Sequence, residues 1–176
     1  MKRKMILAPM IVLLTLFALP VLEALAAPTN GQKVPVTIKF NAYGNIPGER
    51  WDTNGGIIQR RDYTIFYHVS LIIDGAPPLL GECVAMRDSI FNTKEMSNIC
   101  REYYVVSFPS LPPEDTFEGN GLLLITDYNP GPPVTFNIMT HGLFHGTGAF
   151  EGQTINAGYS GPFPGGPGWT GYLLKP

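Results

Sequence analysis

The stretch from residue 63 to residue 73 reads YTIFYHVSLII, and it decides the fold class. Every second position is apolar, which gives the row Tyr63, Ile65, Tyr67, Val69, Leu71 and Ile73. Side chains of a β-strand alternate between two faces, so this pattern predicts a strand with one buried face. A strand of this length usually bends around a barrel or a sandwich.

The same alternation recurs along the chain, and turn residues separate its segments. The sequence holds 20 glycines and 17 prolines, which gather between the apolar stretches, as at 74–78 and 129–133. This distribution is typical of short strands joined by turns. We therefore predict an all-β fold, either an antiparallel barrel of about eight strands or a β-sandwich. The other predicted strands are 34–40, 79–86, 103–108, 121–128, 134–139, 152–159 and 171–174.

The segment 87–102 is where a helix competes with a strand. Thr93 is a suitable N-cap for a short helix that continues through Cys100. The prediction is a crossover with one or two helical turns, so the fold contains at most one short helix.

The N-terminus has the layout of an export signal. Residues 2–4 are basic, residues 5–21 carry no charge, and residues 24–26 read Ala-Leu-Ala. This is the pattern of a signal peptide, with cleavage after Ala26, or alternatively after Ala27. A retained membrane anchor is the alternative, but three residues interrupt the apolar run: Pro9, Pro20 and Glu23. We predict a signal peptide at 1–26 and a secreted or cell-envelope location.

The remaining residues, 27–176, suit a single β-rich domain with a Gly/Pro-rich loop at 158–171. Loss of the signal leaves nine basic and thirteen acidic residues. A mildly negative chain without a basic cluster argues against a nucleic-acid partner. Contact with a membrane is expected only through the signal segment if it is not cleaved.

Cys83 and Cys100 are the only cysteines. An oxidising compartment favours a disulfide between them, which would stabilise the fold by about 3 kcal/mol. Two buried free thiols are the alternative, since sequence spacing does not fix the distance between the Cα atoms.

His141 and His145 share one face if their segment is extended, which makes them candidate metal ligands. Residues four apart in a strand are separated by about 13 Å, so a shared ion requires a bend at Gly142. His68, on the polar row of its own strand, is a candidate third ligand. Histidines that lie on the surface or form hydrogen bonds are the favoured interpretation, and no cofactor is predicted.

The aromatic residues supply most of the predicted core. A barrel interior that they fill only in part would bind an apolar molecule. The candidate ligand-binding residues are Tyr67, Tyr103, Phe136 and Phe150.

The segment Gly146–Gly152, GTGAFEG, resembles the Gly-Thr-Gly-x-Phe-x-Gly signature of the allene oxide cyclase and dirigent barrels. The resemblance runs from Gly121 to the C-terminus by pattern and covers seven residues by motif. It implies an eight-stranded calycin-like barrel with an internal cavity. The Gly/Pro-rich residues 161–168 depart from that family, and no catalytic residue of the family matches a position here. The resemblance therefore transfers no cyclase activity.

No catalytic motif names a reaction in this sequence. The leading hypothesis is a non-catalytic exported barrel that binds a small hydrophobic molecule or a cell-surface partner. An isomerase or cyclase acting in the barrel cavity is the second hypothesis, and a structural subunit of a surface layer or filament is the third. An oligomeric state is compatible with all three.

Overall fold

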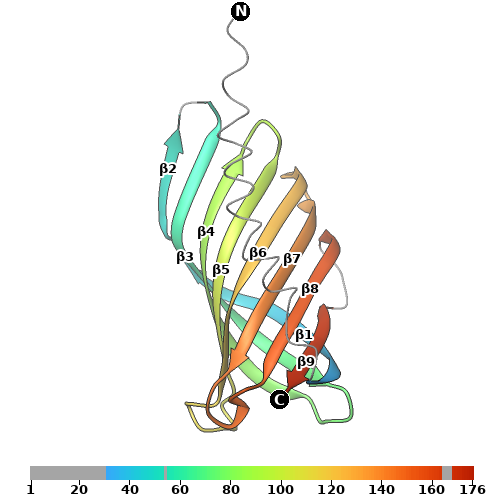
Figure 1. Ribbon diagram of the computed structural model, residues 1–176. Helices are drawn as coiled ribbons and strands as arrows, with labels where there is room; N and C mark the ends of the chain where they lie inside the picture. Colours follow the sequence, from blue (N-terminus) through green and yellow to red (C-terminus); the bar gives the residue numbers. More distant parts are fainter. Residues whose placement is uncertain (1–30, 54, 164–167) are drawn as a thin grey trace, which may run out of the picture. The chain divides into compact units, whose positions relative to one another are not determined.

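The computed structural model describes residues 31–53, 55–163 and 168–176, and these residues form an antiparallel β-barrel with one additional strand (Figure 1). The predicted all-β class is confirmed, and the barrel rather than the sandwich is correct. The strands, with one 3-10 turn, are β1 (Gln32–Ile46), β2 (Glu49–Thr53), β3 (Ile57–Ile73), β4 (Leu79–Asn92), β5 (Ser97–Ser107), β6 (Thr116–Asn129), β7 (Thr135–Gly146), η1 (Gly148–Phe150), β8 (Thr154–Phe163) and β9 (Trp169–Lys175).

The barrel closes at β3, the strand that contains the stretch 63–73. Strand β3 pairs with β4 on one side. On its other side, residues 57–61 pair with β2, and residues 64–73 pair with β1. Strand β1 in turn pairs with β9, which completes the ring β1-β9-β8-β7-β6-β5-β4-β3. One long strand therefore provides both the closing contact and the support for the additional strand β2, which the sequence did not predict.

The predicted helical crossover within 87–102 is wrong. Strand β4 continues to Asn92 and β5 begins at Ser97, so the two strands form a hairpin. The Asn92 Oδ1 atom accepts hydrogen bonds from the backbone N–H groups of Lys94 and Glu95, at 3.0 and 3.2 Å. Thr93 donates both its N–H and its hydroxyl to the Gly56 carbonyl instead of capping a helix. The Asn92 side chain thus stabilises a tight turn where a helix would have started.

One end of the barrel interior is packed with aromatic rings. The rings of Phe117 and Phe150 stack with centroids 4.7 Å apart, and Phe108 meets both of them edge-on. Ile155 and Leu173 are each 1% exposed beside them. This end carries the β5–β6 and β7–β8 connections (bottom of Figure 1). Apolar burial of this kind is the main stabilising contribution in a small domain.

Three aromatic rings lie across the interior above this packed end. Tyr104, Phe144 and Trp169 have centroids 5.5 to 6.1 Å apart, and we call them the aromatic floor. A Cβ atom at Gly142 would lie 2.8 Å from Trp169 Cζ3, and one at Gly121 would lie 2.8 Å from Tyr104 Cε2. The floor therefore depends on a row of small residues that pair across four neighbouring strands: Gly121, Gly142, Ala157 and Gly171.

The predicted disulfide is not formed, because the two cysteines are far apart on the β4–β5 hairpin. Cys83 lies opposite Val106, and Cys100 lies opposite Ser89. The six-residue offset along β5 corresponds to about 20 Å, well beyond the Cα separation that a disulfide permits. Burial raises the pKa of each thiol to about 12. Both side chains are therefore protonated and unreactive core residues at neutral pH.

The predicted signal peptide, residues 1–26, lies outside the described residues. Within residues 31–53, 55–163 and 168–176, no helix has the length and apolar character needed to cross a bilayer. Residues 164–167 of the predicted Gly/Pro-rich loop also lie outside the description, and residues 158–163 of that loop belong to β8.

Candidate ligand-binding cavity

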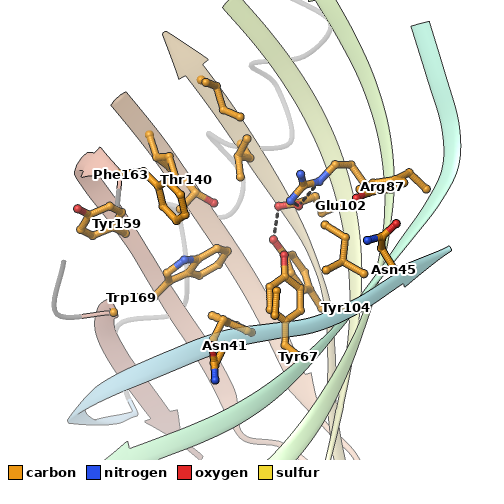
Figure 2. A pocket seen from close by; sticks show the side chains of 18 of the residues that line it. Asn41, Asn45, Tyr67, Arg87, Glu102, Tyr104, Thr140, Tyr159, Phe163 and Trp169 are labelled. Atoms are coloured by element: carbon orange, nitrogen blue, oxygen red, sulfur yellow. Dashed lines mark hydrogen bonds and ion pairs between the residues drawn. The ribbon is translucent and has the colours of Figure 1, made fainter. Parts of the chain in front are cut away.

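The half of the barrel above the aromatic floor holds a cavity of about 580 Å³ (Figure 2). Pockets for small molecules usually measure about 300–1,000 Å³, so this volume suits one organic ligand. Most of its wall is apolar and comes from inward-facing positions of six strands: Phe40, Tyr63, Ile65, Leu123, Ile125, Phe136, Ile138, Phe163 and Trp169.

A buried ion pair lies on the wall formed by β4 and β5. Arg87 and Glu102 are direct cross-strand partners, so the hairpin register places their side chains together. Arg87 Nε donates to Glu102 Oε1 at 2.6 Å, and Arg87 Nη2 forms an ion pair with the same oxygen. The Tyr104 hydroxyl donates to Glu102 Oε2 (Figure 2). The Glu102 side chain is inaccessible to solvent, and that of Arg87 is 15% exposed. We call Arg87, Glu102 and Tyr104 the polar cluster.

Burial and charge keep the groups around this cluster in fixed protonation states. Burial raises the pKa of Tyr67 to about 12, and the nearby negative charge of Glu102 adds to this effect while Arg87 opposes it. Burial, again with the charge of Glu102, raises the pKa of Tyr104 well above its ordinary value. Burial, the largest single effect, would lower the pKa of Arg87, but the Glu102 carboxylate together with Cys100, Tyr67 and Tyr104 outweighs it, so the pKa is raised. At neutral pH, both tyrosines keep their protons and Arg87 is charged.

One cavity hydroxyl is buried without a hydrogen-bond partner in the described part of the chain. Thr140 on β7 is 5% exposed, and its Oγ1 atom is buried without a partner. Tyr67 also lines the cavity, and its ring packs edge-on against that of Phe40, with centroids 5.5 Å apart. Thr140 lies across the cavity from Glu102 and Arg87 in Figure 2. Because an unsatisfied buried polar group is costly, Thr140 Oγ1 is suited to bind a polar atom of a ligand. The protonated Tyr67 hydroxyl is available as a second donor to a ligand.

Of the four predicted ligand-binding residues, the structure brings two together. Tyr67 and Phe136 line the cavity. Tyr103 lies on the outer face of β5, where its hydroxyl donates to Glu118 Oε2 at 2.7 Å. Phe150 belongs to η1 and packs on Phe117 at the packed end of the barrel. Neither Tyr103 nor Phe150 is among the residues that line this cavity.

The candidate metal ligands lie on outward-facing positions and have separate partners. His141 Nε2 is 2.8 Å from Asn156 Oδ1, and His145 Nδ1 is 3.3 Å from Thr154 Oγ1. His68, on β3, stacks against the ring of Tyr43 with centroids 4.2 Å apart. Among the residues that the structure describes, no group of three or more His, Cys, Asp or Glu side chains could hold a metal ion.

Sequence reasoning did not find the polar cluster or Thr140. Arg87 and Glu102 belong to the segment in which a helix was expected. They can be predicted as a cross-strand pair only if residues 87–102 are assigned to a hairpin. The alternation in 97–107, with Glu102 and Tyr104 on one face, was the available signal.

Comparison of the chain with protein-family models, with curated protein sequences and with solved structures gave no match.

Proposed function

We propose that this barrel binds a small, largely apolar molecule in its cavity. The observation that supports the proposal is an unfilled space of about 580 Å³ lined mainly by aromatic and aliphatic side chains. Pockets of this kind, with a few convergent polar groups, are the usual form of small-molecule sites. The size of the space is also notable in a small barrel, because eight strands leave an interior that side chains alone can fill.

The cavity is separated from the packed end by side chains that fix its shape. Tyr104 is 3% exposed and hydrogen-bonded to Glu102, while Phe144 below it is fully buried. A rigid floor lets a ligand bind without ordering these side chains first. Preorganisation of this kind lowers the entropic cost of binding.

Filling the cavity should weaken binding. We expect Ile138→Trp to raise the Kd for the neutral fluorophore N-phenyl-1-naphthylamine at least about tenfold, which corresponds to about 1.4 kcal/mol. Ile138 lines the cavity, so the larger indole occupies the space that the fluorophore needs. The measurement is a fluorescence titration of the purified protein.

The neighbouring residue of β7 provides the matched control. Met139 is 60% exposed on the outer face, so Met139→Trp adds the same side chain outside the barrel and should leave the Kd unchanged. Circular dichroism checks that both variants are folded. Unchanged binding in Ile138→Trp, or no binding by the original protein, would contradict the proposed function.

An isomerase or cyclase acting in the cavity is the second candidate function. A specific observation supports it, since a buried carboxylate and a charged guanidinium lie on the cavity wall beside two protonated tyrosines. Functional sites often contain such buried and coupled ionisable groups. A catalytic role for Glu102 predicts that Glu102→Gln retains fluorophore binding but loses any conversion of the natural ligand. A purely binding role predicts that a recovered ligand is chemically unchanged after incubation with the protein.

We further propose that the chain is exported, because of the basic, apolar and Ala-Leu-Ala segments at its N-terminus. N-terminal sequencing of the protein from the extracellular or envelope fraction of its host should begin at Ala27, or at Pro28. A first residue at Met1 would contradict removal of the signal.

Binding of a cell-surface partner and assembly into a surface layer have weaker support. The additional strand β2 pairs on one side with β3 and offers an edge of only five residues. Short edge strands of this kind usually resist pairing with other chains.

A further inference from the structure

The cavity contains two charged side chains among its described lining residues, and they neutralise each other. These are Arg87 and Glu102, and each is held by the other within the wall. The Glu102 carboxylate also accepts a hydrogen bond from the Tyr104 hydroxyl, so both of its oxygens have hydrogen-bond partners. The cavity therefore offers a ligand no uncommitted charge.

An anionic ligand would meet an unfavourable environment in this cavity. The Glu102 carboxylate, which the hairpin register fixes directly opposite Arg87, already neutralises the guanidinium that a ligand carboxylate would bind. If the ligand does not displace Glu102, two carboxylates share one poorly solvated space and repel each other. A cationic ligand would meet the same difficulty from Arg87.

The other polar groups of the lining are uncharged: hydroxyls, and the side-chain amides of Asn41 and Asn45. The Tyr67 hydroxyl keeps its proton at neutral pH, so it donates a hydrogen bond. Thr140 Oγ1 is buried without a partner among the described residues and either donates or accepts. A ligand oxygen satisfies these groups without bringing charge into the cavity.

We propose that the ligand is an uncharged, mostly apolar compound, an inference that rests on the proposed function. The Tyr67 hydroxyl binds a carbonyl, amide, ether or hydroxyl oxygen of this compound. The apolar walls hold the rest of the molecule, and the ion pair of Arg87 and Glu102 excludes carboxylates. The Thr140 hydroxyl on β7 provides a second polar contact.

Competition between three related compounds tests the charge preference. N-phenyl-1-naphthylamine is bound first and then displaced by 2-naphthamide, 2-naphthoate or naphthalene at pH 7.5. The amide and the carboxylate have nearly the same shape, so the comparison isolates charge. We expect 2-naphthamide to bind at least about tenfold more tightly than 2-naphthoate. Naphthalene shows how much affinity the apolar part alone provides.

Removal of one hydroxyl tests the role of Tyr67. In Tyr67→Phe, we expect the affinity for 2-naphthamide to fall about three- to tenfold, which is the range of one hydrogen bond. The affinity for naphthalene should stay unchanged, because the ring and its contact with Phe40 remain. The matched control is Tyr103→Phe on the outer face, which should alter neither affinity. Melting temperatures confirm that both variants are folded.

The outcomes separate this inference from the proposed function. If 2-naphthoate binds as tightly as 2-naphthamide and Ile138→Trp blocks both, the cavity binds ligands but the inferred charge preference is wrong. If Tyr67→Phe weakens naphthalene as much as the amide, Tyr67 shapes the cavity and does not bind the oxygen. If none of the three compounds displaces the fluorophore, this inference is wrong. If Ile138→Trp leaves fluorophore binding unchanged, the proposed function fails and this inference fails with it.

Discussion

Arg87→Met is expected to lower the free energy of unfolding by about 3–5 kcal/mol, because it leaves Glu102 as an unpaired charge inside the barrel. The Glu102 side chain is fully inaccessible to solvent, and Arg87 is its only ion-pair partner among the described residues. Methionine keeps most of the length of the arginine side chain, so the effect reports the lost charge more than lost packing. Urea denaturation at constant pH measures the change.

A second substitution should restore much of this loss. The double variant Arg87→Met/Glu102→Leu contains neither charge. Replacement of a buried ion pair by apolar residues often leaves the free energy of unfolding nearly unchanged. The exposed pair Arg50–Asp52 provides the matched control, since its side chains are 51% and 64% exposed. Arg50→Met should cost about 0–1 kcal/mol. A single Arg87→Met variant as stable as the original protein would show that the pair is not structurally required.

Phe144→Ala is expected to lower the free energy of unfolding by about 3–5 kcal/mol. Phe144 is 0% exposed and contacts both other rings of the aromatic floor, with centroids 5.5 Å from Tyr104 and 6.1 Å from Trp169. Its removal leaves a void in the floor itself, which borders the packed end that contains the buried ring of Phe117. Because the floor then has a gap, the cavity should extend downward and accept larger ligands.

Urea denaturation and competition with ligands of increasing length measure the two effects of Phe144→Ala. The control is Phe163→Ala, since Phe163 also faces the cavity but is 44% exposed. This substitution should cost less than about 1 kcal/mol. An equal loss of stability in the two variants would contradict a structural role for the floor.

The strands of this barrel could be predicted because period-two alternation persists wherever one face is buried. The row from Tyr63 to Ile73 shows it most clearly, and this row forms the closing strand. The pattern failed between residues 87 and 102, where charged and polar residues occupy inward positions. Hydrophobic periodicity counts Arg87 as polar and therefore exposed. Arg87 is buried because Glu102 lies opposite it on the next strand.

The same limitation explains which ligand-binding residues were found. Tyr67 belongs to an unbroken apolar row, so its inward orientation could be predicted. Tyr103 and Tyr104 are adjacent, and the choice between them depends on which face of β5 is buried. Glu102 shares a face with Tyr104, which makes the inner face look polar in the sequence. The disulfide prediction failed because it depends on strand register, which the spacing of Cys83 and Cys100 does not determine.

The pairing of the first barrel strand with the last has a consequence for biogenesis. Val36 on β1 lies opposite Gly171 on β9, so the ring cannot be completed until β9 is free to pair with β1. Contacts between residues so distant in sequence form slowly, because the intervening chain must first be ordered. A polypeptide with this topology therefore keeps one side of β1 unpaired until β9 has been made and can close the ring.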